Sequence, residues 1–242
     1  NDFNYEPYRA QQILIRVNSQ QIDSFEKITN IPKDLIQLLD ENFFLSNTLI
    51  HQFQKSSDLT IKFSIKLHDN LIIEAVLIPT EKRITACVSS QVGCSLDCNF
   101  CATSRLKRIR NLESYEIYDQ IMLLNNESLK SFSKPISNIV FMGMGEPLLN
   151  YNNVIVSIDL ITGNQGLGIS KKKITLSTSG IYKMIKKMAD DNVKFRLAVS
   201  LHSARQSIRE KIMPFAKKFP LEELLDSLQH WHLKTRKKVT FE

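Results

Sequence analysis

The chain of 242 residues is long enough to bury a sizeable core, and its hydrophobic share of 43% is that of an ordinary globular protein. Its apolar runs are short and interrupted by charged residues, so we expect no membrane-spanning helix. The start at Asn1 to Phe3 lacks the pattern of a signal peptide, which predicts a cytoplasmic protein. Because the first residue is not Met and the last five residues read as an uncapped strand, we expect a fragment of a longer protein.

The net charge of +7 is distributed unevenly along the chain. Residues 1–80 contain 7 Lys and Arg against 10 Asp and Glu, whereas residues 81–242 contain 25 against 15. Three basic clusters lie in the second part: Arg105, Lys107, Arg108 and Arg110; residues 171–173; and residues 236–238. They could release counterions from a phosphate backbone, but a solvated face of scattered lysines is the commoner explanation of such clusters. Charge by itself favours a polyanionic partner only weakly.

Residues 8–44 read as short helices with little strand character. From Ile61 to Leu67 apolar residues alternate with polar ones, which predicts a half-buried strand, and the run from Leu71 to Ile78 predicts a second strand that completes a hairpin. Pro79 ends the hairpin. We therefore predict an amino-terminal accessory domain over residues 1–80 and a second domain over residues 81–242.

Beyond residue 80, short apolar runs alternate with stretches of helical periodicity. The predicted strands are 84–88, 138–142, 174–177, 195–201 and 239–241. Helical spacing is clear at Ile117, Ile121 and Leu124, and again between Leu221 and Leu228. This order predicts an α/β fold, with a parallel sheet that forms a barrel or a doubly wound sheet. In such folds the site lies at the carboxyl ends of the strands.

Three of the four cysteines form the motif Cys94-x-x-x-Cys98-x-x-Cys101 directly after the first of these strands. The flanking Gly93 and polar residues describe a loop, which disfavours buried structural thiols. The odd number of cysteines in the loop and the predicted cytoplasmic location disfavour disulfides, and a zinc site would need a fourth ligand at regular spacing. Three thiolates suit a cubane 4Fe–4S cluster whose fourth iron stays open to a small ligand.

The spacing of the motif resembles that of the radical S-adenosylmethionine (SAM) superfamily, and Phe100 matches the aromatic residue usual before the last cysteine. Four segments resemble the RlmN/Cfr family of rRNA adenine methyltransferases: CVSSQVGC at 87–94, NIVFMGMGEPL at 138–148, LSTSG at 176–180 and LAVSLH at 197–202. The resemblance covers nearly the whole chain and is nearer to the RlmN branch. One departure is the sequence at 107–109, where the family usually has a Gly-Phe pair.

The resemblance implies a partial (β/α) radical SAM barrel, incomplete at its carboxyl end, with a small amino-terminal helical domain and β-hairpin that contacts RNA. The implied metal ligands are Cys94, Cys98 and Cys101, and the implied cofactor-binding residues are Gly145, Glu146, Ser177, Ser200, Leu201 and His202. Gly145 would let the backbone approach the ligand, and Glu146 would accept hydrogen bonds from its ammonium group. A dinucleotide loop at Gly143 is the alternative, but Pro147 breaks the spacing that it needs.

Glu74 and Cys87 carry the catalytic roles that the resemblance implies. Glu74 corresponds to the family's proton acceptor, although a lone carboxylate on a strand usually faces solvent. Cys87 corresponds to the thiol that helps to resolve a covalent RNA adduct. No cysteine follows Cys101, so we expect the methyl-carrying cysteine to lie beyond residue 242.

The implied reaction methylates C2 of an adenine in 23S rRNA (adenosine 2503) and in tRNA (adenosine 37), through a methylated cysteine and a 5′-deoxyadenosyl radical. A radical route is required because this ring carbon is not nucleophilic. The implied cofactors are a 4Fe–4S cluster and S-adenosylmethionine, and the implied partners are 23S rRNA, tRNA and a flavodoxin-type electron donor; we expect a monomer. The alternatives are C8 methylation, a radical SAM enzyme acting on another substrate such as a peptide, and a zinc-bearing RNA-binding module.

Overall fold

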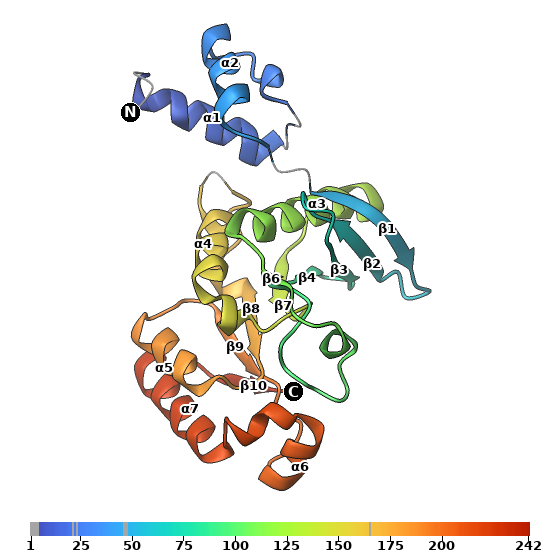
Figure 1. Cartoon of the computed structure of the whole chain (residues 1–242), viewed down its shortest axis with the longest axis vertical. Coiled ribbons are helices and arrows are strands. Elements are labelled where there is room, and N and C mark those ends of the chain that lie inside the picture. The colour runs from blue at the N-terminus through green and yellow to red at the C-terminus, as the bar shows by residue number, and fades with distance from the viewer. Residues whose placement is uncertain (1–4, 21, 23, 46–47, 165) are drawn as a thin grey trace.

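One eight-stranded sheet runs through most of the molecule, and its strands lie in the sheet in the order of the chain. The computed structural model describes residues 5–20, 22, 24–45, 48–164 and 166–242 (Figure 1). The strands are β1 (Leu49–Lys55), β2 (Ile61–Lys66), β3 (Ile72–Pro79), β4 (Ile84–Cys87), β7 (Asn138–Phe141), β8 (Ile174–Thr178), β9 (Arg196–Val199) and β10 (Val239–Phe241). Strands β1 to β4 pair antiparallel, and β4 and the strands after it in the sheet pair parallel.

Helices connect the parallel strands, and all of them except the one at residues 206–212 contribute apolar side chains to the core of the sheet (Figure 1). They are α3 (Ser114–Phe132), α4 (Tyr151–Thr162), α5 (Tyr182–Asp190), α6 (Gln206–Ile212) and α7 (Leu221–Thr235). The main core includes alternate strand residues such as Ile139, Leu176 and Leu197, together with apolar residues of these helices. The prediction of an α/β fold with a partial barrel is confirmed, and within the described residues β1 and β10 are two open edges of the sheet.

The predicted strands of the hairpin and of the parallel sheet are all present, with ends within two residues of those expected. Strand β1 was not predicted. It is an edge strand whose side chains are almost all exposed, and it pairs only with β2, so its sequence lacks the alternation that marks a half-buried strand.

The amino-terminal helices α1 (Pro7–Gln20) and α2 (Lys33–Asn42) pack with the 3-10 helix Phe25–Lys27 around their own hydrophobic cluster. The helical prediction for this region is confirmed where the chain is described; residues 21 and 23, like Asn1 to Phe3, lie outside the described residues. The boundary predicted near residue 80 does not coincide with a break in the sheet, because β3 pairs with β4 across it. The separate cluster ends at Leu45 instead.

Arg110, on the short strand β6 (Arg110–Asn111), joins three parts of the chain. Its Nη1 and Nη2 donate to the two carboxylate oxygens of Glu116 on α3 at 2.7 and 2.8 Å, and its Nε donates to Asp69 in the hairpin turn at 2.7 Å. Glu116 is fully buried. We predicted Arg110 as a phosphate contact together with its basic neighbours, whereas the structure commits its guanidinium to an internal ion-pair network.

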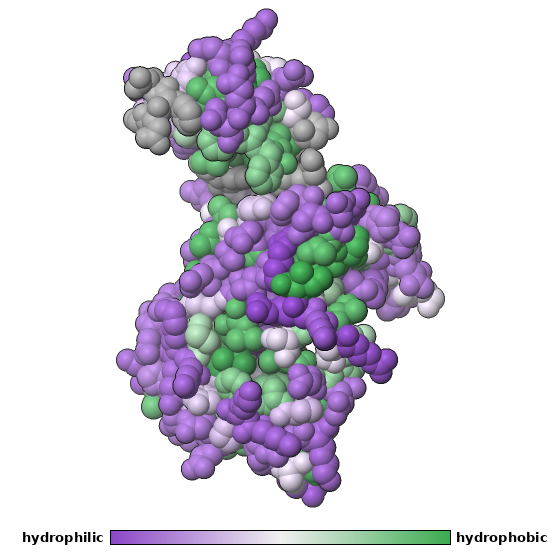
Figure 2. Space-filling model, in the orientation of Figure 1, coloured by the Kyte–Doolittle hydropathy of each residue, from purple (hydrophilic) through white to green (hydrophobic). Residues whose placement is uncertain are grey.

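The surface of the protein combines apolar and hydrophilic regions. On the face shown in Figure 2, apolar side chains gather over the middle of the sheet-bearing part and are bordered by hydrophilic surface. None of the helices in the described part of the chain has the length and apolar character needed to cross a bilayer.

Candidate active site at the carboxyl ends of the parallel strands

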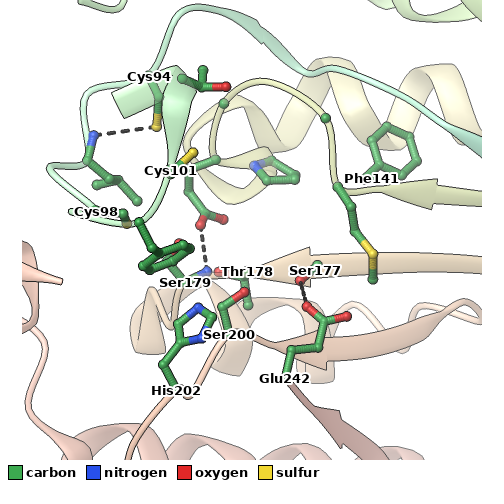
Figure 3. Close-up of a pocket in the computed structure, with 18 residues that line it drawn as sticks. Cys94, Cys98, Cys101, Phe141, Ser177, Thr178, Ser179, Ser200, His202 and Glu242 are labelled. Carbon is green, nitrogen blue, oxygen red and sulfur yellow. Dashed lines mark hydrogen bonds between the residues drawn. The ribbon is translucent and has the colours of Figure 1, made fainter. Parts of the chain in front are cut away.

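A pocket of about 360 Å³ opens where the parallel strands end. Figure 3 shows the three motif cysteines along one side of it and Ser177 with Glu242 on another. Segments far apart in the sequence converge here because the carboxyl ends of parallel strands meet at one edge of the sheet. Eight of the predicted site residues line it: Cys94, Cys98, Cys101, Gly145, Glu146, Ser177, Ser200 and His202.

The cysteine loop, residues 93–109, lies mostly between β5 (Gln91–Val92) and β6 and is shaped by short-range hydrogen bonds. The Cys101 N–H donates to the Cys98 carbonyl at 3.1 Å, and Ser104 Oγ lies 2.6 and 2.7 Å from the carbonyl oxygens of Cys98 and Cys101. Gly93 opens the loop with φ of 75°, and a Cβ there would lie 2.3 Å from the carbonyl oxygen of Lys107. Only glycine therefore allows the two ends of the loop to approach this closely.

The loop docks on a segment that is distant in sequence. Asn99 donates through its side chain to the Lys211 carbonyl at 2.6 Å, across 112 residues of chain, and through its N–H to the Ile212 carbonyl at 2.9 Å. Cys98 shares a hydrophobic cluster with Met213, which follows α6. The loop is therefore held by tertiary contacts as well as by its own hydrogen bonds.

Burial controls the acid–base properties of the motif cysteines. It raises the pKa of Cys94, and it raises the pKa of Cys98 to about 12, with the neighbouring thiols adding to the second shift. A thiol binds a metal only after it loses its proton. A metal bound by these thiols would displace their protons, and its charge would offset the cost of the desolvated thiolates.

Glu146 is almost fully buried beneath the pocket, with 2% of its surface exposed. Its Oε1 accepts the N–H of Leu148 at 3.0 Å, and its Oε2 accepts the N–H of Ser179 at 2.7 Å. Burial raises the pKa of Glu146, while these hydrogen bonds lower it. The side chains of Thr178 and Ser179 also hydrogen-bond to this carboxylate and lower its pKa further.

Hydroxyl groups and an imidazole complete the pocket. Ser177 Oγ donates to Glu242 Oε2 at 3.0 Å, and Ser200 follows β9 at the same edge. His202 has a left-handed backbone with φ of 55°, and its ring centroid lies 4.2 Å from that of Phe100. Burial lowers the pKa of His202, which favours the neutral imidazole.

Leu201 does not line the pocket, although it belongs to the same predicted motif. Its side chain packs against the main core, because successive side chains at a strand end point to opposite faces. Its backbone N–H donates to the carbonyl of Glu242 at 3.0 Å. Leu201 therefore shapes the pocket through packing and this backbone contact.

Glu74 and Cys87 also lie outside the pocket lining. Cys87 pairs with Val76 of β3, and Glu74 is two residues from Val76, so the two side chains share one face as diagonal neighbours. Such neighbours lie roughly 7 to 8 Å apart. The Glu74 side chain is 47% exposed, and its Oε1 lies 2.6 Å from Lys62 Nζ.

The three basic clusters lie at different places. Arg105, Lys107 and Arg108 are exposed on the cysteine loop, beside the pocket. Residues 171–173 and 236–238 precede β8 and β10, so they lie at the amino ends of the parallel strands, away from the pocket. Lys237 is further committed to the carbonyl oxygens of Val193 and Phe195.

Known proteins share both the sequence and this architecture. Residues 88–240 match the model of the Radical SAM superfamily. The chain is 61% identical to a protein of Flavobacterium psychrophilum and 59% identical to one of Flavobacterium johnsoniae, each named a probable dual-specificity RNA methyltransferase RlmN, over 97% and 99% of this chain and 68% of each relative. The chain belongs to the RlmN family of radical SAM methyltransferases. The crystal structure of a radical SAM methyltransferase from Sphaerobacter thermophilus superposes with a TM-score of 0.89 at 32% identity, over 97% of this chain and 69% of that one.

RlmN family membership implies a 4Fe–4S cluster and S-adenosylmethionine as cofactors, and the pocket fits both. In the described part of the chain, no three His, Cys, Asp or Glu side chains are placed to hold one metal ion. A cubane makes a different demand, because each of its cysteines binds a different iron, and three thiols line this pocket from one loop. Glu146, Ser177 and Ser200 offer acceptors for an ammonium group and partners for ribose or carboxylate oxygens.

Sequence patterns did not identify every residue of the site in this RlmN-family chain. Thr178, Ser179 and Glu242 also line the pocket. The sequence did contain a signal for Glu242. It is a polar residue directly after a parallel strand, where sites of this fold class lie, and its side chain is on the same face as that of Thr240.

Proposed function

We propose that this protein methylates C2 of an adenine in 23S rRNA and in tRNA, in agreement with the dual-specificity RNA methyltransferase name of its relatives. The observation that carries the proposal is the convergence of the cysteine motif, a buried carboxylate and strand-end hydroxyl groups on one pocket, beside a sheet face that holds Glu74 and Cys87. A flavodoxin-type electron donor, a cytoplasmic location and a monomeric state belong to the same proposal.

The pocket residues bind and orient the cofactors. When bound, the cluster and S-adenosylmethionine supply the one-electron chemistry that an unreactive ring carbon requires. We assign cluster binding to Cys94, Cys98 and Cys101, and S-adenosylmethionine binding to Gly145, Glu146, Ser177, Ser200 and His202, with Leu201 contributing from the backbone. Gly145 has φ of 94° and passes close to the Gln91 side chain, which leaves no room for a Cβ.

Glu74 is the proposed acceptor of the proton that leaves C2. The Ser89 hydroxyl donates to the Glu74 carbonyl at 2.5 Å, which anchors this part of β3 beside the carboxyl end of β4. The ammonium group of Lys62 orients the carboxylate, and the exposure of Glu74 leaves it accessible to a nucleobase. A general base in reach of the substrate contributes roughly 10² to 10⁴ in rate.

Cys87 is the proposed thiol that resolves the RNA adduct. Burial raises the pKa of Cys87 to about 11, and the charge of Glu242 adds to the shift. The group is therefore a protonated thiol at neutral pH and must lose its proton before it can attack, because the thiolate is the nucleophile.

The remaining roles fall to the RNA-facing surface and to a further cysteine. Arg105, Lys107 and Arg108 are exposed beside the pocket and suit a phosphate backbone. The four cysteines of the chain already have roles in this scheme, so the methyl carrier is proposed to be another cysteine of the full-length protein.

The test is nucleoside mass spectrometry of 23S rRNA and tRNA from a strain that lacks the native gene, complemented with the full-length gene. We expect 2-methyladenosine in both RNAs, and its loss with Glu74→Gln. The matched control Glu81→Gln changes an exposed carboxylate beyond the end of β3 and should restore methylation. Formation of 8-methyladenosine would establish the alternative carbon, and absence of any methyladenosine would refute the proposed function.

A further inference from the structure

Arg209 on α6 is a fully buried cation. Its Nη2 donates to the Ser179 carbonyl at 2.6 Å and its Nη1 to the Phe219 carbonyl at 3.4 Å, whereas its Nε has no hydrogen-bond partner among the described residues. Among the ion pairs of the described chain, none joins Arg209 to a carboxylate. A buried charge without a counterion is costly, so this position calls for an anion.

The cysteine loop is one source of such an anion, because Arg209 donates to Ser179, which lines the same pocket as Cys98. The Arg209 guanidinium carbon lies 5.8 Å from the ring centroid of Phe215, and Phe215 shares a hydrophobic cluster with Cys98. Burial lowers the pKa of Arg209 and the charge of a Cys98 thiolate opposes that shift, while the charge of Arg209 opposes the burial-driven rise in the pKa of Cys98. The buried guanidinium and the cysteine motif are thus electrostatic partners.

The position of this charge is fixed by the backbone that follows β8. Arg209 holds the carbonyl of Ser179, and the N–H of the same residue donates to Glu146 at 2.7 Å. An added Cβ on Gly180 would lie 3.1 Å from Arg209 Nη2, so the backbone that follows β8 packs directly on the guanidinium. The charge therefore has little freedom to reorient when the charge of the loop changes.

We propose that Arg209 is the fixed countercharge of the iron–sulfur site, which compensates the thiolate ligands and raises the reduction potential of the cluster. The proposal rests on the assignment of the cluster to Cys94, Cys98 and Cys101. Reduction adds one negative charge to a site with three thiolates, and a buried cation stabilises the reduced form more than the oxidised form. Net charge and solvent exposure are among the properties that set cluster potentials.

The experiment reconstitutes the whole chain anaerobically and titrates its cluster with reductant, monitored by electron paramagnetic resonance, together with iron and sulfide content. In Arg209→Gln the ratio of reduced to oxidised cluster, at the wild-type midpoint potential, should fall about tenfold, which is 59 mV for one electron. Arg209→Lys keeps the charge and should retain most of the wild-type potential. The control Arg205→Gln removes an exposed charge at the start of the same helix and should leave the potential unchanged.

A purely structural role for Arg209 is tested separately. Arg209→Met replaces the buried charge by an apolar side chain of similar length. If Arg209 acts as a countercharge, the apoprotein of this variant should unfold at the same temperature as the wild type or higher. Loss of the cluster from Arg209→Gln and Arg209→Met, with retention in Arg209→Lys, would support the proposal and would show that the positive charge is needed for cluster binding itself. An unchanged potential in Arg209→Gln, or equal loss in all three variants, would overturn it. A wild-type chain that takes up no cluster would instead refute the cluster assignment itself.

Discussion

The cysteine loop and the neighbouring face of the sheet hold their reactive groups in different ways. The three motif cysteines fall within eight consecutive residues, and local hydrogen bonds with Ser104 turn them toward one pocket. Glu74 and Cys87 are brought together only by the register of β3 on β4. The difference teaches that cofactor binding and the later chemical steps rest on separable parts of the structure. A substitution in the cysteine loop should therefore leave the sheet face intact, and a substitution in the sheet face should leave cofactor binding intact.

The largest expected effect breaks the loop and spares the sheet face. Anaerobic reconstitution should give about four irons and four sulfides per wild-type chain. Cys94→Ala should abolish iron binding, because two thiolates leave the cluster without a third ligand. Cys87→Ala is the matched control and should bind iron normally, because Cys87 lies outside the pocket lining. Equal loss of iron in both variants would show that the loop and the sheet face share one metal site.

The second effect isolates the sheet face. In a variant with serine at the three motif positions, Cys87 is the remaining cysteine of the chain. Because its pKa is raised, its alkylation rate should climb about tenfold per pH unit through pH 9 and reach a plateau near pH 11. The alkylation rate of an ordinary thiol reaches its plateau at about pH 8.5. Alkylation with iodoacetamide, followed by mass spectrometry, measures this profile.

The matched variant Glu242→Gln removes the carboxylate that also raises the Cys87 pKa, so its profile should level at a slightly lower pH. The shift should be the smaller part of the effect, because burial is the main cause. If the alkylation rate of the protein with the original Glu242 already levelled near pH 8.5, Cys87 would be accessible to water in solution.

The third effect concerns the residue that joins the two regions. Arg110→Ala leaves Glu116 fully buried without its guanidinium partner and should lower the free energy of unfolding by about 3 kcal/mol. The lower end of the range applies because the N–H of Glu113 still donates to Glu116. Chemical denaturation of the apoprotein measures the change. The control Arg108→Ala, on the exposed part of the cysteine loop, should change the free energy of unfolding by less than about 0.5 kcal/mol. A similar loss of stability in both variants would show that the ion pairs of Arg110 do not stabilise the fold.

The smallest effect sharpens the comparison at the surface. Charge reversal at Arg105, Lys107 and Arg108 should weaken RNA binding and flatten its dependence on salt, by about one unit of slope for each phosphate that is no longer neutralised. Reversal at Lys172 and Lys173, at the amino ends of the strands, should leave the slope nearly unchanged. Filter binding of a ribosomal RNA fragment over a salt series measures both. The same slope for the two sets would place the RNA elsewhere.

The strands and the cysteine loop were accessible from sequence because their causes are local. Alternation of apolar residues predicted β2, and the apolar run at residues 71–78 predicted β3. The spacing of Cys94, Cys98 and Cys101 predicted one cluster loop. Strand β1 escaped prediction, since an exposed edge strand has no buried face to pattern its sequence. The boundary near residue 80 was placed on the evidence of Pro79, yet the ladder between β3 and β4 carries the sheet across it.

The sequence by itself determined the types of reactive group and the fold class, because spacing and periodicity act over a few residues. Only the tertiary structure decided the charge balance. Arg110 and Arg209 look alike in the sequence, but the fold places two carboxylates around Arg110. It buries Arg209 against backbone carbonyls and the ring of Phe215. The reason is physical: the energy of a charge depends on which partners and how much water surround it, and both are set by segments that meet only in the folded chain.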